Sequence, residues 1–509
     1  MKIQLLTGAA AVALLTPAWA QSTGPSSSAS AYVLPTGPNT SNYTTTSILT
    51  AGDSIGGYQM AGIPDGLGAF DNGNGTFTLL MNHEIASGGA VRTHGGSGAF
   101  VSSWVIRKSD FTVLSGHDQI QSLLNQDGSA VTGTNLNLSR LCSADLPATT
   151  AFYNAASGLG STARIFMDGE EGGLGRGLAH VATGSNAGKS YILSSFVGTG
   201  SNTNSWENLV ANSHQQDKTV VIGLNDNGST NVANKLGVYV GTKTNTGTEA
   251  DKAGLTNGTM KWVSVSGNTA EITNATTRAT SITSGLSFTL TTSASATAFS
   301  RPEDGAWNTL NDSQFYFVTT DRLDTVTDGV GSQIGRSRLW RLNFADITTP
   351  DAGGTIDLLL DGTEGQNMFD NITVTADGHV VLQEDVGGAA HNGKMWDYDP
   401  LADSLTMIMK HDPARNGDIG VSPTAPFNND EETSGVIDIS GIMGVNGTTE
   451  KWLLSSDQQH YSQASPVLEG GQVFAIHQVT PVPEPSTVWS AAGLVGLLIA
   501  ARIRRTRQA

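Results

Sequence analysis

The chain has 509 residues, enough for several ordinary domains or for one large domain built from repeats. It carries 45 Asp and Glu residues against 27 Lys and Arg residues, a net charge of −18, which argues against nucleic acid as a partner and leaves room for cations. Charged residues make up only 14% of the chain and 61 residues are glycine, so the composition argues against a long helical bundle and favours an all-β protein with many turns.

The N-terminus has the features of a secretory signal peptide over residues 1–20. Lys2 precedes an apolar run at residues 5–15, and Ala18-Trp19-Ala20 fits a small-x-small cleavage site. Residues 21–42 begin with a Ser- and Gly-rich stretch and are expected to form a flexible leader. The sequence therefore predicts export, with the folded part beginning near residue 43.

Residues 43–480 are expected to form a single all-β domain. Short strand-like runs alternate with turns rich in Gly, Asn and Asp, and residues 71–75 and 377–378 are typical of hairpin turns. Residues 245–300 are weakly patterned and are expected to form an insertion or an outer sheet edge.

Several apolar runs end on carboxylates. They are residues 77–81 before Glu84, 163–167 before Glu170 and Glu171, 315–320 before Asp321, 380–383 before Glu384 and Asp385, 452–456 before Asp457, and more weakly 298–300 before Arg301, Glu303 and Asp304. In a β-propeller such strand ends meet at one mouth of the central channel, where the acids repel one another unless cations neutralise them. Because calcium accepts about six to eight oxygen ligands, the set predicts a calcium site, although each acid taken alone is more typical of a solvated turn.

Other chemistries fit less well. Residues 52–56 match the GxSxG pattern of a nucleophile elbow, but no helical pattern follows them. His83-Glu84 begins like the zinc motif HExxH, but Ser87 stands in place of the second histidine. Cys142 is the sole cysteine, so no intramolecular disulfide can form, and it is either a small buried side chain or a soft metal ligand. Four scattered histidines are each more typical of structural or surface positions: His180, His214, His391 and His460.

The C-terminus, residues 481–509, resembles the PEP-CTERM sorting signal of Gram-negative bacteria. Val482-Pro483-Glu484-Pro485-Ser486 precedes an apolar stretch at residues 488–501 and an arginine-rich end. The stretch is shorter than the roughly 20 residues of a full membrane span. The resemblance implies export to the periplasm, the outer surface or the medium, transient retention in the inner membrane, and removal of the tail by an exosortase-type enzyme.

Six groups of residues, in order along the chain, resemble motifs of the PhoX-type alkaline phosphatase family. They are residues 62–66 with 82–84, 169–171, 301–305, 369–371, 383–385 and 430–435. The resemblance implies a six-bladed β-propeller with irregular insertions that hydrolyses small phosphate esters at one end of its channel, using calcium and iron. The metal ligands that it implies are Glu84, Glu170, Glu171, Glu303, Asp304, Asp370, Glu384 and Asp385, with Cys142 as the candidate iron ligand. Arg301 and Asn82 would contact the phosphate, and Arg suits a charge-assisted grip on phosphate oxygens.

Two features depart from the family. Lys2 is the only basic residue before the first apolar run, so the chain lacks a twin-arginine signal and would load metal outside the cytoplasm. Cys142 precedes Glu170 by 28 residues, a wider spacing than the family's iron-binding cysteine has. A second function therefore stays open, a non-catalytic, calcium-stabilised propeller of the cell surface or extracellular matrix. Arg301 discriminates between the two, because a purely structural calcium site does not need a guanidinium among its carboxylates.

Overall fold

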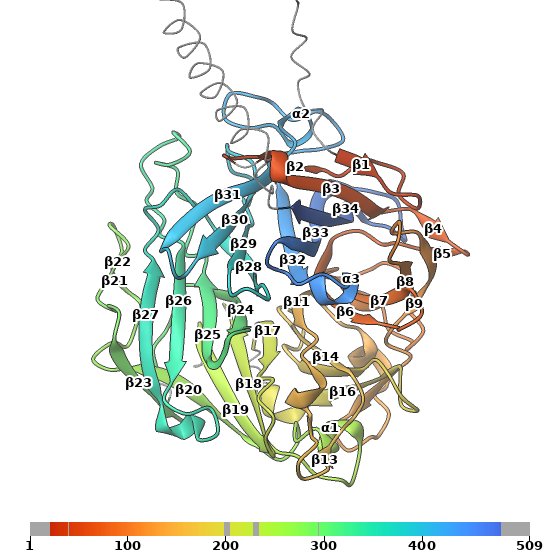
Figure 1. Cartoon of the computed structure of the whole chain (residues 1–509), viewed down its shortest axis with the longest axis vertical. Helices are drawn as coiled ribbons and strands as arrows, with labels where there is room; N and C mark the ends of the chain where they lie inside the picture. Colours follow the sequence, from red (N-terminus) through yellow and green to blue (C-terminus); the bar gives the residue numbers. More distant parts are fainter. Residues whose placement is uncertain (1–20, 39, 198–203, 227–233, 294, 480–509) are drawn as a thin grey trace, which may run out of the picture.

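The protein is all-β and its sheets are arranged around a common centre (Figure 1). The structure, a computed structural model, describes residues 21–38, 40–197, 204–226, 234–293 and 295–479. The predicted signal peptide and the predicted sorting tail lie outside these residues. No helix in the described part of the chain is long and apolar enough to cross a membrane.

Five large sheets make up most of the fold. In the order of hydrogen-bonded neighbours, the first has β6 (Pro64–Asp71), β7 (Thr76–His83), β8 (Phe100–Arg107) and β9 (Val113–Asp118). The second has β11 (Leu141–Asp145), β14 (Ile165–Glu170), β15 (Gly177–Val181), β16 (Lys189–Leu193) and β10 (Ser122–Asn125). The third has β17 (Trp206–Ala211), β18 (Lys218–Asn225), β19 (Lys235–Thr242), β20 (Thr259–Val265), β23 (Leu286–Thr291), β27 (Gly354–Leu360), β26 (Arg338–Phe344), β25 (Asn311–Thr319) and β24 (Pro302–Asn308).

The last two sheets contain strands from both ends of the described chain. One has β28 (Phe369–Val374), β29 (Val380–Glu384), β30 (Lys394–Asp399), β31 (Ser404–His411) and β2 (Val33–Pro35). The other has β32 (Glu431–Asp438), β33 (Glu450–Ser462), β34 (Glu469–Val479), β3 (Tyr43–Thr50) and β1 (Gln21–Thr23). Three two-stranded hairpins lie outside these sheets: β4 (Ser54–Ile55) with β5 (Tyr58–Gln59), β12 (Tyr153–Asn154) with β13 (Leu159–Gly160), and β21 (Ile272–Asn274) with β22 (Ala279–Thr280). The described α-helices are single turns: α1 (Glu249–Lys252), α2 (Pro413–Asn416) and α3 (Ser440–Met443).

Six strands form a closed ring at the centre. Each contacts the next in the order β6, β11, β17, β24, β28 and β32, and β32 contacts β6 again. We call these the ring strands. Each is paired with one antiparallel neighbour, namely β7, β14, β18, β25, β29 and β33 in the same order. This arrangement of sheets around a ring of strands is β-propeller-like.

The segment predicted to be a flexible leader is part of the sheets. β1 pairs in parallel with β3, and β2 pairs antiparallel with β31. Ala31, Tyr32 and Val33 are almost completely buried, and the backbone N–H of Tyr32 donates to Gln472 Oε1 at 3.0 Å. The prediction of a flexible leader was wrong because it relied on the Ser- and Gly-rich start of the segment and gave no weight to this apolar stretch. Because β3 pairs with β34, the sheet that contains β32 joins both ends of the described chain.

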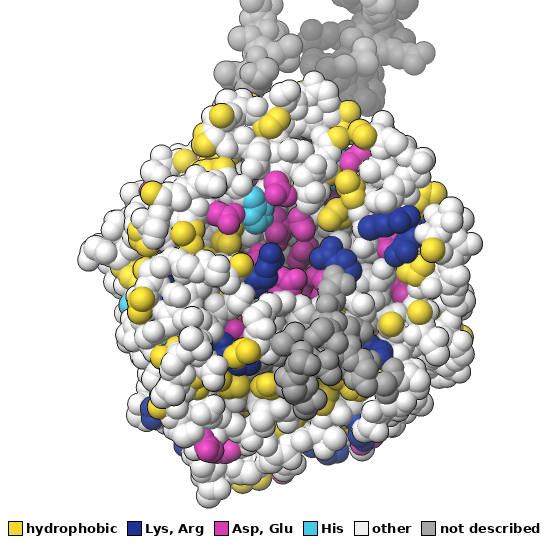
Figure 2. Space-filling view, turned by 180° about the vertical axis from the view of Figure 1, so that it is seen from behind, with side chains coloured by type: hydrophobic (Ala, Val, Ile, Leu, Met, Phe, Trp, Pro, Cys, Tyr) yellow, Lys and Arg dark blue, Asp and Glu magenta, His cyan; other side chains and the backbone are white. Residues whose placement is uncertain are grey.

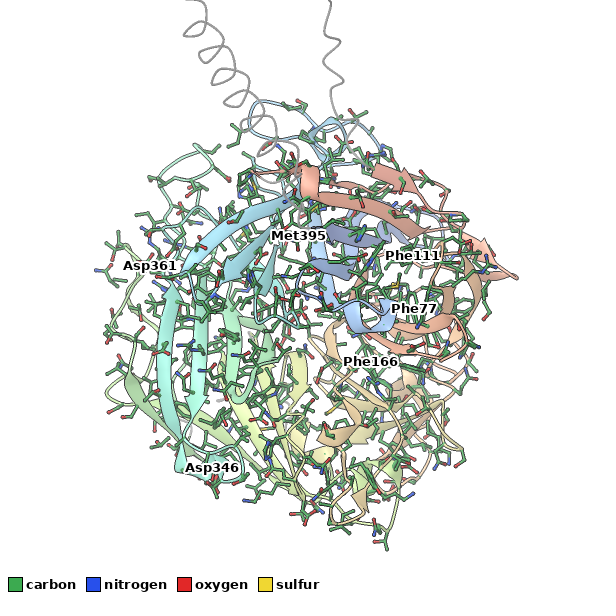
Figure 3. All side chains as sticks on the ribbon, in the orientation of Figure 1. Phe77, Phe111, Phe166, Asp346, Asp361 and Met395 are labelled. Atoms are coloured by element: carbon green, nitrogen blue, oxygen red, sulfur yellow. The ribbon has the colours of Figure 1, made fainter. Side chains whose placement is uncertain are left out.

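The core is divided among the spaces between neighbouring sheets. Separate clusters of buried apolar side chains fill these spaces, and Phe77, Phe166 and Met395 belong to three different ones. Figure 3 shows side chains filling the space between the ribbons, with Asp346 and Asp361 on the outer rim. Residues 245–300, predicted to be an insertion or an outer edge, supply β20 and β23, whose pairing joins the two halves of the nine-stranded sheet.

Candidate metal centre

The second residue of every ring strand lines one small cavity. These residues are Asp65, Cys142, Glu207, Glu303, Asp370 and Glu432. Five are acids and the sixth is the only cysteine of the chain. Six strands that begin at the same mouth thus each contribute one side chain that can ligate a metal.

The local backbone explains why this position faces the channel. In five of the six ring strands the pairing register shifts across this position, as in a β-bulge. In β32 the shift lies further along the strand, between Ser434 and Val436. Four of the strands are also preceded by a residue with positive φ: Ile63 (39°), Arg140 (47°), Arg301 (58°) and Met368 (54°). Bulges and positive φ angles re-aim side chains, and both are common beside functional sites.

A second layer of acids comes from the strands paired with the ring strands. Glu84, Glu171 and Asp385 each follow the last residue of such a strand, β7, β14 and β29 respectively, and all three line the same cavity. Because the paired strands run antiparallel to the ring strands, their ends return to the mouth where the ring strands begin. The cavity therefore receives acids from both strands of a hairpin.

The cavity is small and strongly acidic. It has a volume of about 160 Å³ and is lined by nine carboxyl side chains, two arginines, one histidine and Cys142. The lining residues not yet named as part of it are Arg140, Arg301, Gly387, Asp430 and His460. Figure 2 shows Asp and Glu side chains gathered at the centre of this face, with basic side chains beside them. Even with every base charged, acids outnumber bases by six, so the site is suited to bind cations.

Three overlapping groups of side chains could hold a metal ion. They are Asp65, Glu84 and Cys142; Cys142, Glu171 and Glu207; and Glu207, Glu303 and Asp370, and the ligand atoms within each group lie within 4.8 Å of one another. Gln458 Nε2 donates to both Asp65 Oδ2 and Glu84 Oε2, at 2.9 Å each. The oxygen-rich donor set fits hard cations such as calcium, and the Cys142 thiol adds one soft ligand.

Burial and mutual repulsion raise the pKa values of these acids. Burial, followed by repulsion from Glu432, raises the pKa of Glu84 to about 7, and the same two causes raise the pKa of Asp385 to about 7. Burial is also the main cause of the raised pKa of Cys142 and of the acids at four ring positions: Asp65, Glu207, Glu303 and Asp370. A bound cation would remove this penalty on ionisation.

Three basic side chains border the cavity. Arg140 Nη1 donates to Glu84 Oε1 at 2.8 Å, and Arg301 Nη2 lies 2.7 Å from Glu303 Oε1. His460 Nδ1 lies 2.9 Å from Glu469 Oε2. Burial lowers the pKa of His460, but interaction with the nearby carboxylates of Glu432 and Glu469 outweighs it and raises that pKa to about 11, which favours the cationic imidazole. Positive groups therefore stand at the edge of an acidic centre.

Seven of the residues implied by the family resemblance come together in this cavity. They are Glu84, Cys142, Glu171, Arg301, Glu303, Asp370 and Asp385. The other four, Asn82, Glu170, Asp304 and Glu384, do not line it.

Each of those four side chains has other partners. Asn82 Nδ2 donates to the backbone carbonyl of Cys142 at 2.9 Å. Glu170 accepts from Arg176 Nε at 2.6 Å and Nη2 at 2.7 Å, and Glu384 Oε1 accepts from Trp396 Nε1 at 2.8 Å. Asp304 Oδ1 accepts from Asn208 Nδ2 at 2.6 Å. In each adjacent pair of acids the two side chains alternate in direction along the strand, so only one can face the mouth.

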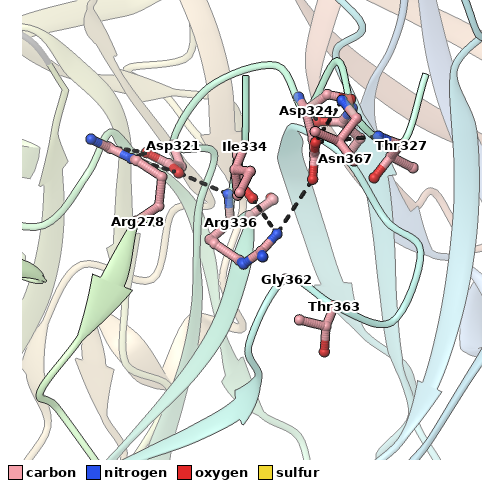
Figure 4. Close-up of polar contacts among 12 residues, drawn as sticks. Arg278, Asp321, Asp324, Thr327, Ile334, Arg336, Gly362, Thr363 and Asn367 are labelled. Carbon is pink, nitrogen blue, oxygen red and sulfur yellow. Dashed lines mark hydrogen bonds and ion pairs between the residues drawn. The ribbon is translucent and has the colours of Figure 1, made fainter. Parts of the chain in front are cut away.

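Two further strand-end acids are also held away from the cavity. Asp321 is paired with Arg278 and accepts a hydrogen bond from the Arg336 backbone N–H at 2.7 Å, in the network shown in Figure 4. Asp457 Oδ1 lies 2.9 Å from His411 Nε2 and accepts from Gln459 Nε2. Neither acid lines the cavity. Each of these two acids is instead held by a basic side chain that lies outside the cavity, Arg278 or His411.

Several residues that line the cavity are not among the metal ligands or phosphate contacts predicted from the sequence. They are Asp65, Arg140, Glu207, Asp430, Glu432 and His460. Three of the ring positions share a sequence pattern. Asp65, Glu207 and Asp370 each follow an apolar residue and precede a Gly or Asn, and this pattern could have identified them. Glu303 stands in a similar setting, between Pro302 and Asp304.

Comparisons with known proteins bear on the fold. No protein-family model and no curated protein sequence matches the chain. Among solved structures, Pseudomonas fluorescens PhoX in complex with vanadate, a transition-state analogue, is similar over 87% of this chain and 96% of that chain, with 11% identity and a TM-score of 0.54. A putative 6-phosphogluconolactonase from Bacteroides uniformis has a TM-score of 0.28, with 10% identity over 78% of this chain and 95% of that chain. An α-L-arabinofuranosidase from Podospora anserina has a TM-score of 0.33, with 9% identity over 91% of this chain and 98% of that chain. The first of these likenesses shows a PhoX-like fold.

Proposed function

We propose that the protein is an exported, metal-dependent phosphoesterase that hydrolyses small phosphate esters at the acidic cavity. In this proposal the sheets of the described chain, β1 and β2 included, form one six-bladed β-propeller with each ring strand as the innermost strand of one blade, and calcium occupies the cavity. The PhoX-like fold supports the phosphoesterase class, and the three metal-capable groups support metal dependence.

The observation that carries the proposal is the pair of arginines at the rim of the acidic cavity. Arg140 and Arg301 each contact carboxylates that line it. A site that only stored calcium would gain nothing from guanidinium groups, since they compete with the cation for the same carboxylates. A guanidinium beside a metal site is well suited to hold phosphate oxygens with two parallel hydrogen bonds.

The metal ligands we propose are the members of the three overlapping groups, with Asp385 and Glu432 beside them. When bound, calcium would neutralise the phosphoryl group and stabilise the charge that develops as the ester bond breaks. Cys142 belongs to two of the groups and would hold iron, if iron is present, through its thiolate. The acids thus hold cations, and Arg301 orients the phosphate.

Export remains part of the proposal. The features of residues 1–20 favour secretion, and those of residues 481–509 favour transient membrane retention and trimming by an exosortase-type enzyme. Metal would then be acquired outside the cytoplasm, where calcium is plentiful.

Hydrolysis of p-nitrophenyl phosphate tests the proposal. We expect turnover with calcium, a further increase with calcium plus iron if Cys142 ligates iron, and none after chelation. Glu303→Gln should abolish calcium-dependent turnover, whereas Glu450→Gln, which alters an acid outside the cavity, should not. A folded wild-type protein that binds calcium but turns over no ester under any of these conditions would refute the proposal and favour a structural surface propeller.

A further inference from the structure

A second pocket adjoins the acidic cavity at Arg301. It has a volume of about 230 Å³, and Arg301 lines both spaces. Most of its lining residues come from the β21–β22 hairpin and from residues 298–301, which lead into β24. Neither space alone reaches the roughly 300–1,000 Å³ of a small-molecule site. The two spaces are therefore suited to hold different parts of one ligand.

The second pocket is basic, whereas the cavity beside it is acidic. Arg278 and Arg301 are the charged side chains among its described lining residues, and none of those residues is Asp or Glu. This is unusual in a chain with 45 acidic residues and only 27 Lys and Arg residues. A group that enters this pocket thus meets positive charge, and a group in the cavity meets negative charge unless cations are bound there.

Arg278 is held by one edge of its guanidinium. Its Nε donates to Asp321 Oδ1 at 2.9 Å, and its Nη2 donates to Ser300 Oγ at 3.0 Å and to Asp321 (Figure 4). Asp321 does not line the pocket. The remaining nitrogen, Nη1, donates to no described residue and is not among the buried atoms that lack a partner, so it is open to a ligand.

Arg301 is held in a similar way. Its Nε donates to Asp226 Oδ2 at 3.3 Å and its Nη2 lies 2.7 Å from Glu303 Oε1, while its Nη1 donates to no described residue. The side chains of Arg278 and Arg301 are 16% and 30% exposed, so both are accessible but restrained. Because a guanidinium has five N–H donors, each arginine keeps donors for an anion after its contacts with the acids.

We propose that the phosphate ester bound at the acidic cavity carries a second anionic group, which the second pocket binds through Arg278. This inference rests on the proposed phosphoesterase function and specifies its substrate class. The phosphate would lie beside Arg301 in the cavity, and the second anion would accept from Nη1 of Arg278. An uncharged substituent would gain less, because charge-assisted hydrogen bonds are about twice as strong as neutral ones.

Titration calorimetry with phosphonates tests the inference, because phosphonates have no ester bond to hydrolyse. The probes are phosphonoacetate, 3-phosphonopropionate and 4-phosphonobutyrate, each compared with the alkylphosphonate in which a methyl group replaces the carboxylate. The calcium-loaded full chain should bind one of the three carboxylates about ten- to a hundred-fold more tightly than its alkyl counterpart, the ratio expected for a hydrogen bond between charged groups. Equal affinity within all three pairs would overturn the inference.

A double variant shows whether Arg278 is the source of this preference. Arg278→Gln combined with Asp321→Asn removes the arginine without leaving its buried partner charged and unpaired, and should bring the affinity for the carboxylate down to that for the alkylphosphonate. Arg336→Gln is the matched control, because Arg336 belongs to the same network and lines neither space (Figure 4). A preference that survives the double variant would mean that the carboxylate binds the metal instead, and would overturn the inference.

A second pair of variants covers the case in which the double variant fails to fold. Ala270 lines the pocket and is partly exposed, so Ala270→Glu adds a carboxylate that competes for the two arginines, and Ala270→Gln adds a neutral side chain of the same size. The preference should be weaker in Ala270→Glu than in Ala270→Gln, and equal preference in the two would contradict the inference.

The two proposals can fail separately. Turnover of p-nitrophenyl phosphate without any preference for the phosphonocarboxylates refutes the second anion site and leaves the phosphoesterase. A preference that depends on Arg278, in a protein that hydrolyses no ester, refutes the phosphoesterase and supports the pocket as an anion site.

Discussion

Arg301 and Glu303 are two residues apart, and Arg301 Nη2 lies 2.7 Å from Glu303 Oε1 at the edge of the acidic cavity. Arg301 also contacts Asp226 through Nε at 3.3 Å, and its backbone has a positive φ of 58°. The guanidinium is thus held by the acids around it and by an uncommon backbone conformation. A preorganised cation of this kind loses little entropy when it binds an oxyanion.

Replacing Arg301 with lysine should reduce phosphoesterase activity. Lysine keeps the charge but cannot form two parallel hydrogen bonds, so we expect kcat/KM to fall by about 10²- to 10³-fold with calcium affinity nearly unchanged. Steady-state kinetics and calcium titration measure the two effects. Arg341→Lys is the matched control, because Arg341 pairs with Asp357 outside the cavity. Equal loss of activity in both variants would mean that Arg301 has no specific role.

Glu207→Gln should change stability in opposite directions with and without metal. Glu207 belongs to two of the three metal-capable groups, and its carboxylate is buried among other acids. Removing its charge relieves repulsion, so the unfolding temperature of the metal-free variant should exceed that of the wild type. With calcium the order should reverse, because a ligand is lost. Scanning calorimetry in chelator and in calcium tests this, and an unchanged order would contradict a metal role for Glu207.

The metal-free protein should lose stability as the pH rises. The pKa values of Glu84 and Asp385 are raised from 4.5 and 3.8 to about 7, so between these limits the folded state binds more protons than the unfolded chain. Their contribution to stability is complete below about pH 4 and is lost as the pH rises through about 7. In chelator, the unfolding temperature should therefore be lower at pH 8 than at pH 5, and calcium should remove or reverse this difference. A metal-free protein that becomes more stable over this interval would contradict the account.

Glu170 and Glu171 are adjacent and should behave differently. Glu170 forms a buried ion pair with Arg176, so Glu170→Gln leaves a buried charge unpaired and should destabilise the fold by about 3–5 kcal/mol with little effect on calcium affinity. Glu171 lines the cavity, so Glu171→Gln should weaken calcium binding and leave the metal-free stability similar or higher. Urea denaturation and calcium titration of both variants measure this. The account fails if Glu170→Gln is the variant with the larger loss of calcium affinity.

The sequence predicted the all-β class, but it could not distinguish between adjacent acids. The pairs at 170–171 and 384–385 follow apolar runs in the same way, yet one member of each pair faces the cavity and the other is bound by Arg176 or Trp396. That choice depends on side chains from distant parts of the chain. Glu207 stands at the start of a ring strand and belongs to none of the six motif groups, so neither an apolar run ending on an acid nor the family resemblance marks it.

Orthovanadate binding tests the central claim most directly. The metal-free cavity has six more acids than bases and should repel an oxyanion, whereas bound calcium would reverse the local charge and leave Arg301 to hold the anion. We predict that vanadate binds the calcium-loaded protein and not the chelated protein, and that Arg301→Lys weakens this binding. If calcium binds and vanadate does not, the cavity is a structural calcium site and the protein is not a phosphoesterase.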